Sequence, residues 1–132
     1  PMLMDTGGNS GSQASVTVIR AMSLGDIEFS DVFQVVWKEA RVGMLCAATL
    51  GIVVFFKVII IDQKSILMAF VVALTIFATI VIAKLVGCLL PMLAKRLGFD
   101  PAVMASPFIT TVVDALSLVI YFLIATQVMS IT

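Results

Sequence analysis

Oxygen-bearing side chains recur at helical spacing in two parts of this sequence. In the last apolar run, Ser106, Thr110 and Asp114 follow one another at intervals of four residues, so in a helix they share one face. Near the start of the chain, Asp5 and Asn9 begin a second stripe with the same spacing. Carboxyl, hydroxyl and amide oxygens, without imidazole or thiolate among them, are the ligands that a hard cation such as Mg²⁺ or Ca²⁺ prefers.

Small residues surround the stripe that contains Asp5, and their presence has two interpretations. Small side chains let helix backbones approach closely in lipid, so packing alone would explain them. Bare glycine carbonyls beside carboxyl and amide groups also supply cation ligands, and we favour this second interpretation, with Gly8 as a candidate ligand. The small residues are Gly7, Gly8, Gly11, Ser12 and Ser15.

The composition is that of a membrane protein. Of the 132 residues, 61% are hydrophobic and 12% are charged, and the mean hydropathy is +1.20, whereas about a quarter of the residues in a globular domain are charged. Eight acidic residues balance eight basic ones, so the chain has no basic field with which to bind nucleic acid. There is no histidine, and the two cysteines are isolated in apolar runs. We therefore expect neither a zinc site nor the nucleophile of a common enzyme class.

We expect an all-α membrane protein in which one domain, residues 1–132, forms a bundle of four transmembrane helices. About 20 mostly apolar residues suffice to cross the hydrocarbon layer. The first helix is the least apolar, and its assignment rests on an unbroken helical pattern. Pro91 is expected to end the third helix. The predicted helices cover residues 1–25, 41–61, 65–90 and 102–130, with a short interfacial segment at 30–38.

Basic residues gather on one side of the predicted bundle. Loops on the cytoplasmic side of membrane proteins carry an excess of Lys and Arg. We therefore place the loops at 20–41 and 91–101 on the cytoplasmic side of a multi-pass protein of the cell membrane. The residues on this side are Arg20, Lys38, Arg41, Lys95 and Arg96, against Lys57 and Lys64 on the other.

Asp114 lies inside a predicted membrane helix, where a charged carboxylate costs roughly 2.5–3.5 kcal/mol. Three environments would relieve that cost. We favour a water-filled cation path; the alternatives are an ion pair with Lys84 and a protonated carboxyl that hydrogen-bonds a neighbouring helix. Lys84 itself is expected to face lipid and to extend its ammonium group to the interface.

Two motifs give the chain a resemblance to the MgtE magnesium channel/transporter family. The segment from Pro1 to Arg20, with Gly-Gly-Asn-x-Gly-x-Gln beginning at Gly7, resembles the second membrane helix of that family. Pro-Phe-x-Thr-Thr-x-x-Asp, which ends at Asp114, resembles its final helix. Together with the intervening Gly87–Pro91 and Lys95–Gly98 segments, the resemblance covers essentially the whole chain.

The resemblance implies a homodimer with a pore on its two-fold axis, lined by the helices that contain Asn9 and Asp114. It implies that Asp114 binds hydrated Mg²⁺, helped by Thr110 and Ser106. Asp5 is our own addition: it either concentrates cations near the outer mouth or is simply solvated there. The family also has cytosolic regulatory domains and one further membrane helix ahead of the first helix here, so we expect this chain to be a fragment.

The expected function is movement of Mg²⁺, as the transported and bound ion, through a dimeric pore along its electrochemical gradient. One alternative is an exchanger that couples Mg²⁺ to Na⁺. The other is a membrane module that transports nothing and whose polar stripes only drive dimerisation. The expected partners are a second copy of the chain, the lipid bilayer, and Mg²⁺ with other divalent cations.

Overall fold

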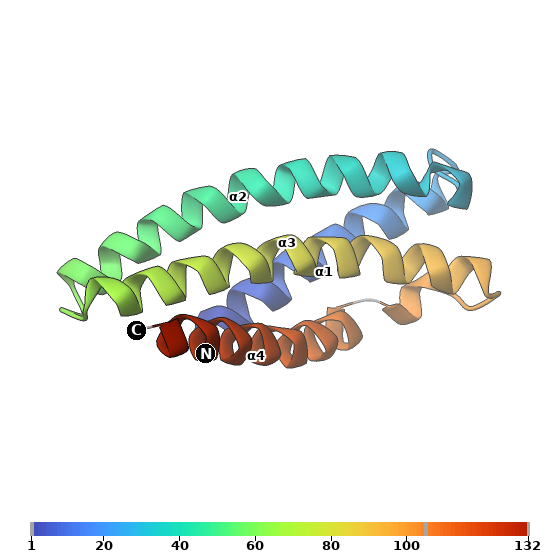
Figure 1. The fold of residues 1–132 in the computed structure, drawn as a ribbon. Helices are drawn as coiled ribbons and strands as arrows, with labels where there is room; N and C mark the ends of the chain where they lie inside the picture. The colour runs from blue at the N-terminus through green and yellow to red at the C-terminus, as the bar shows by residue number, and fades with distance from the viewer. Residues whose placement is uncertain (1, 105, 132) are drawn as a thin grey trace.

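The computed structural model describes residues 2–104 and 106–131, apart from the side chains of Met104 and Ser106. The described residues form helices and turns and contain no strand, which confirms the all-α class. The elements are α1 (Met2–Ser23), the 3₁₀ helix η1 (Phe29–Asp31), α2 (Val32–Ile60), α3 (Ile66–Arg96), the 3₁₀ helix η2 (Pro101–Met104) and α4 (Ser106–Ile131) (Figure 1).

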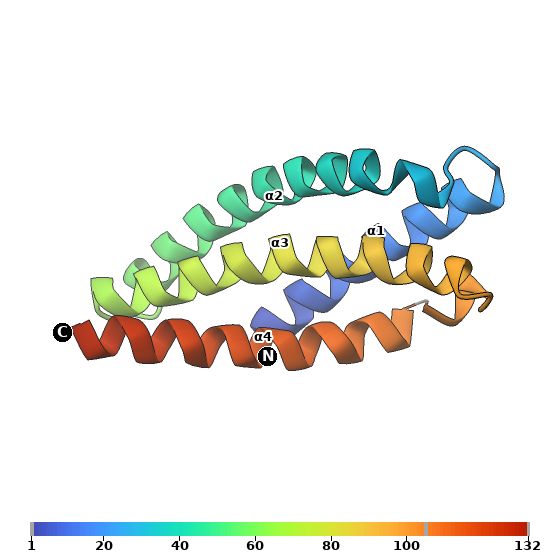
Figure 2. The ribbon, with the colours of Figure 1, turned by 45° about the vertical axis from the view of Figure 1, so that its right-hand side comes forward.

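Helix α3 lies at the centre of the bundle. It packs against α1, α2 and α4, and α1 also packs against α4. The helices alternate in direction, so the α1–α2 turn and the end of α3 lie at one end of the bundle, while the α2–α3 turn and the end of α4 lie at the other (Figures 1 and 2). A buried apolar cluster joins α2 to α3; it contains Ala47, Val54, Val58, Ala69, Ile76 and Ile80.

Three helical segments are long and apolar enough to cross a membrane: Phe29–Ile60, Ile66–Arg96 and Pro107–Ile131. At 1.5 Å per residue, the 31 residues of α3 extend about 46 Å, more than the ~30 Å hydrocarbon layer. Large apolar side chains such as Phe56, Phe70 and Leu123 are exposed on the surface of the bundle. These features are those of a multi-pass membrane protein. Helix α1 does not meet the same criterion among the described residues, so its crossing of the membrane stays a prediction.

Helix α2 differs from the expected pair of segments, an interfacial piece at 30–38 and a membrane helix at 41–61. It is one continuous helix that begins at Val32, because no glycine or proline interrupts the chain before Gly43. A capping box precedes it: the backbone N–H of Glu28 donates to the carboxylate of Asp31 at 3.0 Å.

Helix α3 also runs further than expected, because it continues through Pro91 to Arg96. Proline cannot donate a backbone hydrogen bond to the carbonyl of the residue four positions earlier, here Gly87. Pro91 and its neighbour Met92 are buried, and Met92 packs with Val18 and Met22 of α1. Neighbouring helices make a proline inside a membrane helix tolerable. At the start of the last helix, η2 occupies 101–104, where the first residues of the predicted 102–130 helix were expected.

A tight turn separates α1 from α2. Gly25 has a φ of +76°, a conformation that glycine adopts without steric cost, and its N–H donates to the Met22 carbonyl at 3.2 Å. The N–H of Asp26 donates to the Ala21 carbonyl at 3.0 Å, which completes a glycine-terminated helix end. The turn brings α2 back along the bundle.

Candidate functional site

Glycines let α1 fit closely between α3 and α4. A Cβ at Gly87 of α3 would overlap the carbonyl group of Gly11 in α1, so the two backbones are in direct contact. On the other side, a Cβ at Gly11 would lie 2.9 Å from Ile109 Cγ2 of α4. Close approach of small residues is how membrane helices pack in the absence of a hydrophobic driving force. The glycines of α1 therefore have a packing role, as the first of the two interpretations proposed.

Gly8 lies against the polar side of α4. A Cβ at this position would be 3.0 Å from Thr110 Cγ2 and 3.5 Å from Asp114 Oδ1. One turn further along α1, Ser12 Oγ and Thr110 Oγ1 form a hydrogen bond of 3.2 Å. The fold thus brings Gly8, Ser12, Thr110 and Asp114 together, and we call these four residues the α1–α4 polar site. Ser12 was not among the candidate ligands, although its position four residues after Gly8 places it on the same side of the helix.

Asp114 is the unusual member of this site. Its Oδ1 atom is shielded from solvent and accepts no hydrogen bond within the described part of the chain. No lysine or arginine nitrogen described here lies within ion-pair distance of it either. A buried carboxylate oxygen without a hydrogen bond or a counter-charge is energetically unfavourable. Asp114 as a whole is only partly buried, so a cation or water can supply the partner that the described residues do not.

The other candidate ligands occupy different positions. Asp5 and Asn9 are exposed, and the 100° rotation per residue puts them on the face of α1 opposite the buried Gly7 and Val18. Among the described residues, neither forms a hydrogen bond or an ion pair with Asp114. The side chain of Ser106, at the first residue of α4, lies outside the described side chains.

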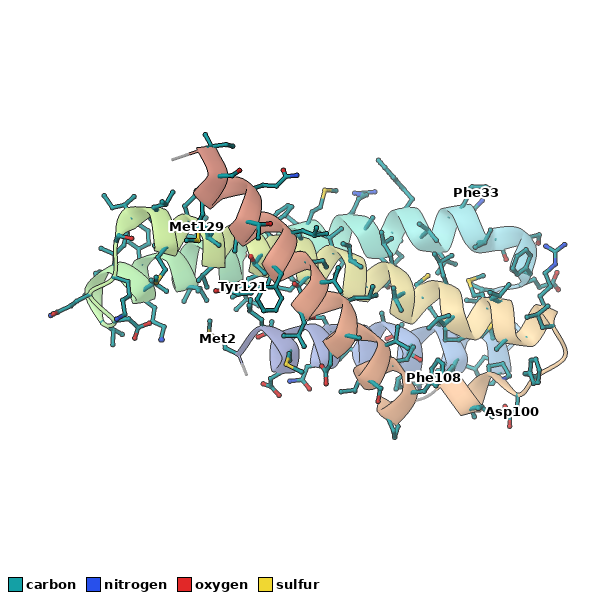
Figure 3. All side chains as sticks on the ribbon, turned by 60° about the horizontal axis from the view of Figure 1, so that its bottom comes forward. Met2, Phe33, Asp100, Phe108, Tyr121 and Met129 are labelled. Atoms are coloured by element: carbon teal, nitrogen blue, oxygen red, sulfur yellow. The ribbon has the colours of Figure 1, made fainter. Side chains whose placement is uncertain are left out.

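The start of α1 lies beside the middle of α4. Met2 and Met4 line a common surface hollow with Ser117 and Tyr121, and Figure 3 shows α4 crossing α1 there, with Tyr121 close to Met2. Asp5 is therefore one turn of α1 away from Gly8, on the side toward the α2–α3 turn. An exposed stripe of carboxyl and amide groups at this depth does not suit hydrocarbon, so it requires water or another polar surface.

Lys84 does not face lipid, and it does not pair with Asp114. It is buried, with 8% of its surface exposed, and its Nζ lies 3.6 Å from Oε2 of Glu39 on α2. Gly43 makes room for its aliphatic stem: a Cβ there would lie 3.4 Å from Lys84 Cγ. This pair was not expected from the sequence, because residues 20–41, which include Glu39, were predicted to form a cytoplasmic loop. The continuous helix α2 brings it into the bundle.

No other part of the described chain offers a stronger cation site. Among residues 2–104 and 106–131, no group of three or more His, Cys, Asp or Glu side chains gathers in a way that could hold a metal ion. A hollow of about 340 Å³ between α2 and α3 is walled by apolar side chains, including Phe55 and Phe70, and offers no ligand to a hydrated ion. The α1–α4 polar site is therefore the candidate functional site of this chain.

Comparison with known proteins agrees with the resemblance seen in the motifs. A family model described as MgtE, divalent cation transporter, matches residues 1–124. The chain is 38% identical over 125 residues to the magnesium transporter MgtE of Thermus thermophilus, which is 95% of this chain and 27% of that protein. It is 36% identical over 126 residues to the magnesium transporter MgtE of Bacillus subtilis, and 34% identical over 128 residues to that of Enterococcus faecalis.

These two alignments cover 96% and 97% of the chain, and 28% of each relative. The chain thus spans little more than a quarter of the length of the relatives it matches. The region matched by the family model contains α1, α2, α3 and most of α4, together with the α1–α4 polar site. On this agreement, the chain belongs to the MgtE family of divalent cation transporters.

Proposed function

We propose that this chain forms the ion pathway of a transporter that moves Mg²⁺ across the cell membrane. The observation that carries the proposal is Asp114 Oδ1, a carboxylate oxygen inside a candidate membrane span that accepts no hydrogen bond among the described residues. A cation that passes beside it would supply the missing counter-charge. The named activity of the three relatives, magnesium transport, supports Mg²⁺ as the ion.

The proposed pathway lies on the two-fold axis of a homodimer, between the α1 and α4 helices of the two copies. One Asp114 supplies a single negative charge, so two copies together balance one divalent cation. The exposed face of α1 with Asp5 and Asn9 supports this arrangement, because a second copy would cover it and keep it away from lipid. Gly8, Thr110 and Ser106 would contribute oxygens that hold the waters of a largely hydrated ion, since Mg²⁺ loses its waters reluctantly.

The proposed orientation places the α1–α2 turn and the end of α3 in the cytoplasm. These two regions lie at the same end of the bundle (Figure 2). Five of the eight basic residues lie in the helix segments beside them: Arg20, Lys38, Arg41, Lys95 and Arg96. A doubly charged ion that crosses toward a negative interior gains roughly 4.6 kcal/mol per 100 mV, twice the value for a single charge. Transport down this gradient needs no nucleotide.

The test is Mg²⁺ flux into liposomes by the intact protein and by Asp114→Asn, which keeps the size of the side chain and removes its charge. We expect the flux to fall by about 100-fold, because the ion loses its principal counter-charge in a region of low dielectric constant. Asp26→Asn, the same change at an exposed acid in the α1–α2 turn, is the matched control and should leave the flux unchanged.

Two outcomes would contradict this function. If Asp114→Asn weakens the dimer but leaves Mg²⁺ binding and flux as they were, the α1–α4 polar site is a dimerisation surface. If flux in the unaltered protein requires an opposing Na⁺ gradient and saturates at a slow turnover, the protein is a coupled exchanger. Single-channel currents would instead show a continuous pore.

A further inference from the structure

The ion pair between Glu39 and Lys84 is buried inside the bundle, and the proposed pathway does not use it. Each of the two residues has 8% of its surface exposed, and the charged atoms are 3.6 Å apart, which is ion-pair distance but too long for a hydrogen bond. Glu39 Oε2 has no hydrogen-bond partner in the described residues. The contact between these two side chains is therefore electrostatic, and Lys84 is the cation that neutralises Glu39.

Lys84 belongs to α3, the helix that packs against both helices of the α1–α4 polar site. Ala83, the residue before Lys84, is fully buried and packs in one cluster with Ile109 and Val113 of α4. Val113 directly precedes Asp114. Lys84 and Asp114 extend from two helices in contact, Lys84 toward Glu39 of α2 and Asp114 toward Gly8 of α1. Because the Coulomb energy falls only as the inverse of distance and is larger at low dielectric constant, an uncompensated charge at residue 84 would act on a divalent cation at Asp114.

Glu39 removes that effect. An uncompensated ammonium group would repel a divalent cation, whereas the neutral pair presents only a small dipole. We infer that Glu39 is a positioning residue for transport: it holds Lys84 toward α2 and cancels its charge, and so sets the affinity of the Asp114 site for Mg²⁺. This inference rests on the proposed function, because it assumes a cation at Asp114.

The experiment measures the Mg²⁺ concentration that gives half-maximal flux into liposomes. It compares the intact protein with two variants, each of which replaces one charged side chain of the pair by a neutral one. Glu39→Gln leaves the lysine charge uncompensated, and we expect the half-maximal concentration to rise by about tenfold. Lys84→Gln leaves the carboxylate charge uncompensated, and we expect the same concentration to fall. Glutamine keeps a hydrogen-bonding group at either position, which limits the structural damage. If the pair had only a structural role, the half-maximal concentration would change in the same direction in both variants.

The double variant Glu39→Gln/Lys84→Gln is the matched control, and it should return the half-maximal concentration to within about twofold of the original value. A monodisperse elution profile in detergent shows which variants are folded. If one single variant does not fold, the other single variant and the double variant still test the inference. Equal shifts in the two single variants, or no shift in either, would overturn the inference. If Asp114→Asn also leaves the flux intact, the proposed function itself has failed; if only the opposed shifts are missing, the failure belongs to this inference alone.

Discussion

Glu39 and Asp114 are carboxylates of the same bundle with opposite surroundings. Both have an oxygen atom that is shielded from solvent and accepts no hydrogen bond from the described residues. Glu39 lies between α2 and α3, where Lys84 approaches to 3.6 Å. Asp114 lies between α1 and α4, where the neighbouring groups are the Thr110 side chain and the bare backbone of Gly8.

The difference separates a structural charge from one available to an ion. In a region of low dielectric constant, each carboxylate needs a positive partner or a proton. The chain supplies that partner permanently at Glu39, so an external cation has no access to it. At Asp114 the chain supplies none within its described residues, and the backbone that faces the carboxylate is that of Gly8. This contrast, rather than the number of acidic residues, identifies the candidate cation site.

The largest expected effect concerns the free energy of unfolding, which should respond differently to changes at the Glu39–Lys84 pair and at Asp114. Lys84→Met leaves a buried carboxylate unpaired, and we expect it to reduce the free energy of unfolding by roughly 3–5 kcal/mol. Asp114→Asn removes a charge that already lacks a partner, so we expect the free energy of unfolding to stay the same or rise. Thermal unfolding in detergent without Mg²⁺ measures both.

Added Mg²⁺ sharpens the same comparison. It should raise the unfolding temperature of the unaltered protein, because a ligand that binds only the folded state stabilises it, and it should have no effect on Asp114→Asn. Equal destabilisation by Lys84→Met and Asp114→Asn would show that the two carboxylates have equivalent surroundings.

A second, smaller effect distinguishes the helix contacts of the two regions. Gly87→Ala puts a methyl group against the Gly11 backbone, where neither atom can move without shifting a helix, and we expect a loss of about 1–3 kcal/mol. Gly51→Ala, in the α2–α3 contact, meets only the Ala73 carbonyl at 3.5 Å.

We expect Gly51→Ala to be neutral or to stabilise the protein by up to about 1 kcal/mol, because alanine favours the helix. Denaturation followed by fluorescence or circular dichroism compares the two variants. A tolerated Gly87→Ala would mean that α1 is not held at the distance from α3 that positions Gly8 beside Asp114.

The smallest effect concerns Asp5, which is exposed on α1 one turn from Gly8. Asp5→Asn should reduce Mg²⁺ flux by less than about twofold, and only at low ionic strength, because salt screens exposed charges beyond about 10 Å at 0.1 M. Flux measured at two salt concentrations checks this. A large loss that persists at high salt would place Asp5 in the pathway beside Asp114.

Part of this organisation was predictable from local patterns. The four-residue spacing of Thr110 and Asp114 placed them on one helix face. The small residues near Gly8 allowed two interpretations, and the close helix contact was the one not favoured. The continuity of α2 was not predictable in this way, because the membrane helix was expected to begin at the charged residue Arg41, after a separate amphipathic segment at 30–38. Continuation of α3 through Pro91 also depended on packing, because proline by itself favours a helix end.

The sequence by itself determined that the protein is helical, that it enters a membrane, and that oxygen ligands recur along two of its helices. Those properties follow from the composition and from the roughly 100° rotation per residue, and both can be evaluated for one helix at a time. Only the tertiary structure decided which helix each charge faces: Lys84 pairs with Glu39, and Gly8 and Thr110 surround Asp114. The reason is physical, because pairing between charges falls off over a few ångströms, and helix packing sets distances on that scale.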